Sequence, residues 1–373
     1  MELELRGGVR AAPVAGRTPA ERQALRWAPD PRERTADPAH IARTARELEE
    51  DGLDSALVVQ SSSWPDPWAV AGWALAATTR LRIAAAHRIG TTSPTAAART
   101  LATLDRLSGG RISAHLIIGS SDADVARDGD TLPKAERYRR ADEYLSLLTR
   151  YLAAEDDLDH HGEYYTVRAA RSGLRPHPGS ELLSFGGSSP AGVDLAARYA
   201  QVYAVPPRPL PDTRLRIAAA RAAATRHGRT LRIWRHVTVV LADTDTAAQQ
   251  HLRRLRRDAL RLATGPDAAR YHDAVALDRD RERGTADPGT ADPGAVDRDP
   301  GTAATQVAAY IRRSLAGAYT GSPATVAARI NLLRSAGVDI VQLDLPVETD
   351  HDRALRRALV AQLRDPVPLR RAW

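Results

Sequence analysis

Two glycines followed by two serines form the most informative motif of this chain. A short apolar run ends in Gly186, Gly187, Ser188 and Ser189, and an amphipathic segment begins at Pro190. Glycines let a backbone approach a ligand closely, and the unpaired N–H groups at a helix start attract anions. The motif therefore predicts a site for a phosphate-bearing ligand. The same residues are also typical of an ordinary turn and N-cap, and the motif alone leaves that alternative open.

Histidines are the second group of residues suited to chemistry, because the unperturbed pKa of a histidine is about 6.5. Arg235 and His236 are adjacent in an apolar run, so in a strand their side chains point to opposite faces. We predict that His236 is the inward-facing catalytic residue, with Arg235 as a second catalytic candidate. His115, Gly119 and Tyr138 are candidates for contact with a cofactor. For each histidine, a satisfied interior side chain is the alternative interpretation.

The motifs that the chain lacks narrow the chemistry further. It contains no Gly-x-Ser-x-Gly elbow, P-loop, dinucleotide fingerprint or His-Glu-x-x-His motif. It has no cysteine, which excludes thiolate metal ligands and disulfides. The adjacent His160 and His161 lack a third ligand at a useful spacing, so we expect a solvated turn there and no metal site. The reaction is therefore expected to depend on an organic cofactor.

Composition limits the class of protein. Of 373 residues, 43% are hydrophobic and 27% are charged, which is typical of a globular chain. The net charge of +7 comes from arginines scattered beside acidic residues, with Lys134 as the one lysine and only 5% aromatic residues, so we expect no nucleic-acid partner. No apolar run reaches the roughly 20 residues that span a bilayer, and no secretory signal is visible at the N-terminus. We expect a cytoplasmic protein that does not bind membranes.

Eight short apolar runs alternate with longer helical patterns through most of the chain. This order predicts parallel strands joined by helices, closed into a (β/α)8 TIM barrel that forms one domain over residues 1–373. The ligand site of such a barrel lies at the C-terminal ends of its strands. The predicted strands are Leu3–Leu5, Ala56–Val59, Leu81–Ala86, Ile112–Ile118, Leu182–Phe185, Val202–Val205, Ile233–Leu241 and Ile340–Leu345.

Two segments interrupt the alternation. Residues 7–37 would make an unusually long, irregular first connection, part of which we expect over the barrel mouth or disordered. Residues 280–304 form a low-complexity insertion, in which 284–301 repeat Gly-Thr-Ala-Asp-Pro without apolar periodicity. We predict that this insertion is disordered.

Several segments taken together carry a family resemblance. They are residues 93–99 leading into 104–111, Asp128-Gly129, 136–144, Phe185–Ser189, 326–330 and Gly337-Val338. In combination they resemble the bacterial-luciferase-like flavin monooxygenases, and among these the alkanesulfonate monooxygenase branch. The resemblance extends over about residues 52–260 and again from 322 onward.

This resemblance implies a function. The family binds reduced FMN (FMNH2) that a separate NAD(P)H-dependent flavin reductase supplies, reacts it with O2 and oxygenates an organic small molecule through a flavin peroxide, without a metal. It also implies a homodimer or homotetramer. His236 falls on the family's histidine of the seventh strand, and the glycine–serine motif falls on its FMN phosphate site. A degenerate flavin-binding protein and an F420-dependent oxidoreductase are the alternatives.

The chain departs from the branch at polar positions, which bears on the substrate. Apolar residues stand there instead, namely Trp64, Ile118, Trp234 and Leu345, and Arg312 and Arg313 are possible substitutes for a lid arginine. A sulfonate would lose charge-assisted hydrogen bonds worth about 1.5–3 kcal/mol each. We therefore predict a substrate other than a simple alkanesulfonate, larger and more apolar, with Trp64 and Trp234 as contacts. Packing of either tryptophan into the barrel wall is the alternative.

Overall fold

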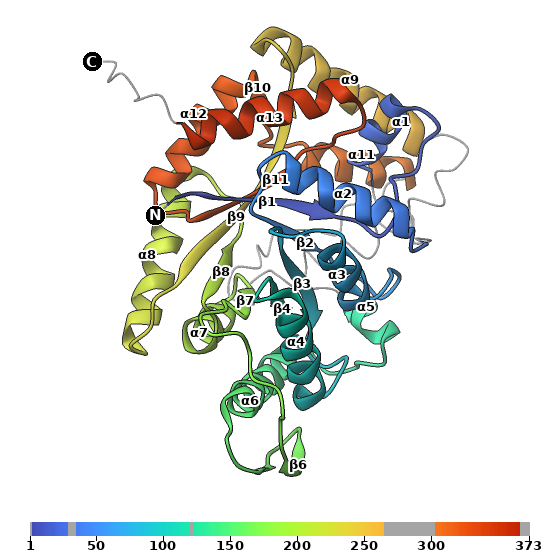
Figure 1. Ribbon diagram of the computed structural model, residues 1–373. Coiled ribbons are helices and arrows are strands. Elements are labelled where there is room, and N and C mark those ends of the chain that lie inside the picture. The colour runs from blue at the N-terminus through green and yellow to red at the C-terminus, as the bar shows by residue number, and fades with distance from the viewer. Residues whose placement is uncertain (1, 29–34, 120–121, 265–302, 366–373) are drawn as a thin grey trace, which may run out of the picture.

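Eight parallel strands form a closed barrel, which confirms the predicted (β/α)8 fold (Figure 1). The strands are β1 (Glu4–Val9), β2 (Ser55–Val58), β3 (Arg82–Arg88), β4 (Ile112–Ile117), β7 (Leu183–Gly186), β8 (Val202–Val205), β9 (Arg232–Leu241) and β11 (Ile340–Asp344). They pair in that order, and β11 pairs with β1 to close the ring. Each predicted strand coincides with one of them. The computed structural model describes residues 2–28, 35–119, 122–264 and 303–365.

Helices surround the barrel on its outer side (Figure 1). They are α1 (Pro19–Leu25), α2 (Pro38–Glu50), α3 (Pro67–Ala76), α4 (Pro94–Ser108), α5 (Asp122–Arg127), α6 (Lys134–Ala153), α7 (Pro190–Tyr199), α8 (Leu210–Arg226), α9 (Asp245–Ala263), α11 (Ala303–Ser314), α12 (Pro323–Ser335) and α13 (Asp350–Arg364). Among the described residues, none of these helices combines the length and the apolar character needed to cross a membrane.

A recurring pair of residues explains where many of these helices begin. A serine, threonine or aspartate accepts a hydrogen bond from a first-turn N–H, and a proline occupies the next position, as at Ser93-Pro94 and Ser189-Pro190. The fixed φ of proline suits the first helical residue, and its missing N–H would have no partner there. The same pairing starts α1, α2, α3 and α12. The sequence therefore fixes the helix that follows the glycine–serine motif.

The barrel separates two apolar layers. The larger core lies between the strands and the surrounding helices, and it contains residues such as Leu5, Ile83 and Phe185. A smaller cluster fills the barrel interior and consists of Leu57, Ala84, Ala86, Val202, Trp234 and Ile340. Because side chains alternate along a strand, the interior positions are every second residue. This interior cluster separates the two ends of the barrel.

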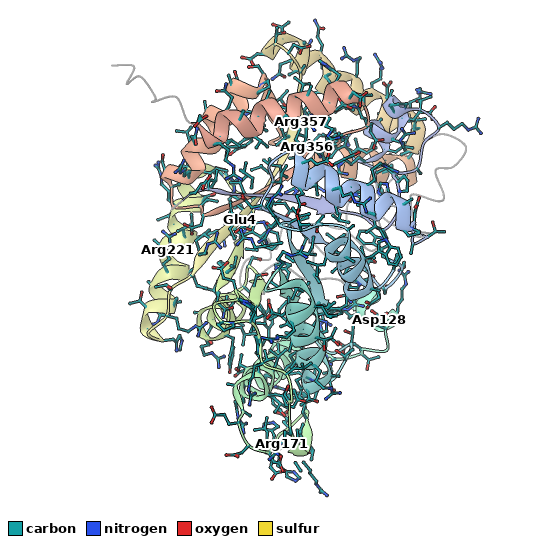
Figure 2. All side chains as sticks on the ribbon, viewed as in Figure 1. Glu4, Asp128, Arg171, Arg221, Arg356 and Arg357 are labelled. Carbon is teal, nitrogen blue, oxygen red and sulfur yellow. The ribbon has the colours of Figure 1, made fainter. Side chains whose placement is uncertain are left out.

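A two-stranded hairpin outside the barrel differs from the prediction made from the sequence. His160 and His161 lie in strand β5 (Leu158–His161), which pairs with β6 (Thr166–Ala170), so the prediction of a solvated turn is wrong. The His160 Nε2 atom lies 2.9 Å from Glu143 Oε1 of α6, and this contact holds the hairpin. Figure 2 shows Arg171 beside the hairpin, at the end of the molecule away from α13.

The structure describes most of one of the two segments that interrupt the predicted alternation of strands and helices, and little of the other. The connection 7–37 contains the end of β1 and the helix α1, which packs with α9 and α11 in a cluster that includes Trp27. The low-complexity insertion 280–304 lies outside the described residues except at its end, where α11 begins. A three-residue strand, β10 (Tyr319–Gly321), pairs with the extended end of β9.

Candidate functional site

The glycine–serine motif lies at the C-terminal end of β7, where the barrel rule predicts a ligand site. Ser189 is the N-cap of α7, and its Oγ accepts a hydrogen bond from the Gly192 N–H at 3.2 Å. The same hydroxyl donates to the Tyr138 hydroxyl at 2.7 Å, which brings α6 to the motif. The Tyr203 hydroxyl donates to the Gly187 carbonyl at 2.8 Å. The structure thus brings together Tyr138, Gly187 and Ser189, three of the residues predicted to bind the cofactor.

Both glycines lie at close approaches of neighbouring side chains. A Cβ at Gly186 would lie 2.8 Å from His115 Nε2, and one at Gly187 would lie 3.0 Å from the Phe185 ring and 3.5 Å from the Tyr138 hydroxyl. Burial raises the pKa of the Tyr138 phenol, so this group stays protonated. The groups around the motif are hydroxyls and the start of a helix, and this set of donors suits an anion.

His115 lies beneath the motif, inside the barrel. Its Nδ1 is 3.0 Å from the Ser184 hydroxyl, and its ring meets the Trp234 ring edge-on with centroids 4.4 Å apart. The guanidinium of Arg6 lies 4.4 Å from the centroid of the same tryptophan. Burial, together with the charge of Arg6, lowers the pKa of His115 to about 3. His115 is therefore neutral at physiological pH and supports the motif from below without adding charge.

His236 faces the barrel interior, one pleat closer to the mouth than Trp234. Its Nε2 lies 3.6 Å from Asp344 Oδ2, at the end of β11, and its side chain is 38% exposed. The exposure leaves the ring accessible from the mouth. Arg235 points to the opposite face, where its guanidinium donates to the Arg208 carbonyl at 2.6 Å. The structure therefore does not bring Arg235 together with His236.

Asp344 is a site residue that the sequence reasoning missed. Although burial alone would raise the pKa of this carboxyl, Arg26 and His236 hold it well below its ordinary value. Arg26 Nε donates to Asp344 Oδ1 at 2.9 Å, and the second guanidinium nitrogen contacts the same oxygen. The carboxylate therefore stays charged and restrains the histidine. An acidic residue ending a predicted barrel strand was the signal that could have revealed it.

The arginine at the end of β3 organises the loops of the mouth. Arg88 is buried, and its guanidinium pairs with Asp124 of α5 at 2.6 Å and also contacts Asp128. Asp124 in turn accepts a hydrogen bond from the Ser62 hydroxyl at 2.6 Å. Gly119, with a φ of +78°, lets this region pack, because a Cβ there would overlap Val125. These contacts join the loops after β2 and β4.

The positions that differ from the resembled branch lie at different depths. Trp234 is only 3% exposed and belongs to the interior cluster, whereas Trp64 is half-buried in the turn after β2. Ile118 and Leu345 pack in or against the outer core. Arg312 and Arg313 are exposed on α11. Of the two predicted substrate contacts, Trp64 alone lies in a loop that leaves the barrel mouth.

Solved structures of several enzymes share the fold over nearly the whole chain. A riboflavin lyase (RcaE) with modified FMN and riboflavin is 19% identical and covers 98% of this chain and 92% of that chain, with a TM-score of 0.74. EDTA monooxygenase (EmoA) from Chelativorans sp. BNC1 is also 19% identical, with coverage of 98% and 94% and a TM-score of 0.72. An F420-dependent secondary alcohol dehydrogenase is 15% identical, with coverage of 98% and 100% and a TM-score of 0.67.

A family model identifies the relationship at the level of sequence. The model described as luciferase-like monooxygenase matches residues 17–340, which include the glycine–serine motif, Tyr138 and His236. The match confirms the family that the motifs resemble and does not single out the alkanesulfonate branch. The chain therefore belongs to the luciferase-like monooxygenase family and is an enzyme of that family.

Proposed function

We propose that this enzyme is a two-component, FMN-dependent monooxygenase that oxygenates an organic small molecule other than a simple alkanesulfonate. The observation that carries the proposal is the placement of two groups at one barrel mouth. The hydroxyls of Tyr138 and Ser189 surround a glycine motif at the start of α7, and His236 faces the interior of the same barrel.

The motif suits the phosphate of FMN. Gly186 and Gly187 allow a close approach, Ser188 and Ser189 add hydroxyls, and the protonated Tyr138 adds a donor. When bound in its reduced form, the flavin supplies the electrons that activate O2 for transfer of one oxygen atom. We propose that a separate NAD(P)H-dependent reductase delivers it, and that the enzyme works as a homodimer or homotetramer.

His236 is the residue that we propose for proton transfer. Asp344 lies 3.6 Å from its Nε2 and is itself held by Arg26, so the imidazole is restrained at the mouth. A histidine in this position donates or accepts a proton at the reacting centre, an effect that commonly changes rates by about 10²–10⁴-fold. Asp344 acts through the histidine and is a positioning residue.

The arginines of the mouth support a substrate that is not a sulfonate. Arg26 is paired with Asp344 and Arg88 is paired with Asp124, whereas Arg235 points to the outer face and is bound to a backbone carbonyl. A sulfonate would have to compete with these partners for guanidinium N–H groups. The half-buried Trp64 favours an apolar or aromatic molecule instead. The chain would then share motifs with the alkanesulfonate branch without sharing its substrate.

The test combines cofactor binding with isotope transfer. With a flavin reductase, NADH and 18O2, the wild-type enzyme should place one labelled oxygen in a product from a panel of apolar and aromatic compounds, and none in alkanesulfonates. The His236→Ala variant should bind FMN with unchanged affinity and lose product formation by at least about 10²-fold. His351→Ala is the matched control, because this histidine is exposed at the start of α13. Equal product formation in the His236→Ala and His351→Ala variants contradicts the role of His236.

Use of F420 is the second candidate, since an F420-dependent alcohol dehydrogenase shares the fold. The two cofactors are separated by titrating the protein with each and following quenching of tryptophan fluorescence. Saturation with FMN but not with F420 supports the monooxygenase. Saturation with F420 alone contradicts it.

A further inference from the structure

A ring of inward-facing residues lies one pleat above the interior cluster, on the mouth side. Because side chains alternate along a strand, the residue two positions after a buried interior residue faces inward again. On β11, Ile340 is fully buried in the interior cluster, whereas Gln342 is partly exposed. Since the cluster separates the two ends of the barrel, Gln342 is exposed to the mouth. We call these partly exposed inward residues the mouth ring, and they are Gly8, Val59, Ile117, Gly186, Ala204, His236 and Gln342.

The mouth ring carries polar side chains on one side only. His236 and Gln342 can form side-chain hydrogen bonds, whereas the other members of the ring are glycines or hydrocarbon side chains. The two polar residues lie on the adjacent strands β9 and β11 and are paired in register. Neighbouring strands lie about 4.8 Å apart, so the two side chains stand next to each other on the inner face. Within the ring, a bound molecule therefore meets polar side chains along this one wall.

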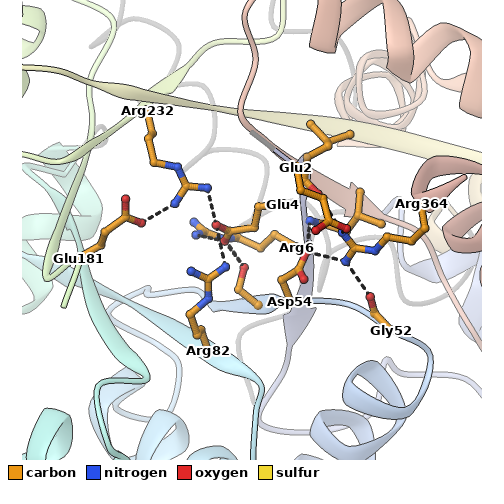
Figure 3. A network of polar contacts seen from close by, with 12 residues as sticks. Glu2, Glu4, Arg6, Gly52, Asp54, Arg82, Glu181, Arg232 and Arg364 are labelled. Carbon is orange, nitrogen blue, oxygen red and sulfur yellow. Dashed lines mark hydrogen bonds and ion pairs between the residues drawn. The ribbon is translucent and has the colours of Figure 1, made fainter. Parts of the chain in front are cut away.

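The side-chain amide of Gln342 is not engaged by the protein. Among the described residues, neither its carbonyl oxygen nor its NH2 group takes part in a hydrogen bond. Its in-register neighbour on the other side is Arg6 of β1. Arg6 is turned toward the N-terminal end of the barrel, where it donates to Glu4 and to the Ser55 hydroxyl, each at 2.9 Å (Figure 3). Arg6 therefore leaves the amide to a ligand.

The charges near Gln342 indicate that this ligand group is neutral. Asp344, one pleat closer to the mouth on β11, is kept charged by Arg26, so it repels an anion. The same ion pair already matches the charge of Asp344, so a cation gains little there. An ionised group would lose water without gaining an opposite charge. An amide offers one acceptor oxygen and two N–H donors without charge, which suits a carbonyl or a hydroxyl group.

We propose that Gln342 is a specificity-determining residue, whose amide binds a neutral carbonyl or hydroxyl group of the substrate beside His236. This inference rests on the proposed function, because it assigns the space at the mouth ring to the substrate. The substrate is then a largely apolar molecule that carries such a group close to the residue proposed for proton transfer. A hydrocarbon of the same shape leaves the amide without a partner, and this unpaired group is what discriminates against it.

The test measures the binding of matched compounds to the FMN-loaded enzyme by calorimetry, without a reductase. The probes are compounds of similar shape, such as 1-tetralone and 1-tetralol against tetralin, and acetophenone against α-methylstyrene. Wild type should bind the oxygen-bearing member about 5- to 150-fold more tightly, as expected when a polar group would otherwise lose its partner. In Gln342→Met, which keeps the length of the side chain, this preference should fall to about twofold or less. Gln362→Met, at an exposed glutamine of α13, is the matched control and should keep the wild-type preference.

The affinity for FMN distinguishes a substrate contact from a flavin contact. The proposal requires that Gln342→Met binds FMN as wild type does while it loses the preference. Weaker FMN binding in this variant overturns the proposal, because the amide would then bind the flavin. It is also overturned if wild type shows no preference in any pair, or if Gln342→Met keeps it. None of these measurements uses O2, so a failure to transfer labelled oxygen would count against the monooxygenase activity and not against this binding site.

Discussion

Two buried histidines should make this enzyme lose stability as the pH falls through the weakly acidic range. Burial lowers the pKa of His87 to about 4, and burial with the charge of Arg6 lowers that of His115 to about 3. Both side chains are less than a tenth exposed. His87 is held between the Trp68 indole and the Tyr144 hydroxyl, and His115 between Ser184 and Trp234.

The direction of this pH dependence follows from the number of protons that the folded and unfolded states bind. The unfolded chain protonates both histidines near pH 6.5, whereas the folded state keeps them neutral, so the unfolded state binds more protons and stability decreases as the pH drops. From the two lowered pKa values, each histidine costs about 2 kcal/mol at pH 5 relative to pH 7.5. Together they cost about 4 kcal/mol, which is a large part of the roughly 5–15 kcal/mol typical of a folded protein.

Urea unfolding followed by tryptophan fluorescence at pH 7.5, 6.5, 5.8 and about 5 measures this loss. The His115→Gln variant should be less stable than wild type at pH 7.5, since the ring contacts are lost, but its stability should fall only about half as steeply with pH. His87→Gln should behave in the same way. His161→Gln, an exposed histidine of β5, is the matched control and should keep the wild-type slope.

The change in unfolding free energy with pH, rather than its value at one pH, tests this prediction. A wild-type loss below about 1 kcal/mol between pH 7.5 and 5 would refute the reasoning, since two neutral buried histidines require several times that value. An unchanged slope in both glutamine variants would also refute it, because the protons would then be taken up elsewhere.

Two further substitutions test the packing of the site and of the barrel. Gly186→Ala places a Cβ 2.8 Å from His115 Nε2 and should weaken FMN binding by about tenfold or more, as measured by fluorescence titration. The control is Gly173→Ala, which has open space around it and should leave FMN binding unchanged. Asp51→Asn should destabilise the fold by about 3–5 kcal/mol in urea unfolding, because the fully buried carboxylate pairs with three arginines of α13. The control is Glu50→Gln, which removes an exposed ion pair and should cost at most about 1 kcal/mol.

The barrel was predictable because its strands are coded locally. Each strand is a short apolar run, and residues such as Gly109, in the left-handed conformation after α4, mark where the intervening helices end. The strand β10 was not predictable, since its three residues depend on pairing with the extended end of β9. The β5–β6 hairpin was missed for a similar reason, because Glu143 of a distant helix holds His160.

The site was predictable in part, and the limit has a physical origin. Serine before proline encodes the N-cap at Ser189, and strand alternation encodes the inward direction of His236. Alternation does not reveal depth along the barrel axis, so it did not show that Trp234 is buried in the interior cluster. Partners from distant strands, such as Asp344 and Tyr203, depend on the closure of the barrel.

A column of contacts along the barrel axis connects Arg6, near the N-terminal ends of the strands, to the mouth. Arg6 stacks on Trp234, this ring meets His115 edge-on, and His115 occupies the space that a side chain at Gly186 would need. The positive charge of Arg6 acts with burial to keep His115 neutral. Because the ring beneath the motif carries no charge, the hydroxyls and the start of α7 are left as its anion-binding groups. Arg6 therefore helps to define the mouth without reaching it, and a change in its charge should alter both ends of the barrel.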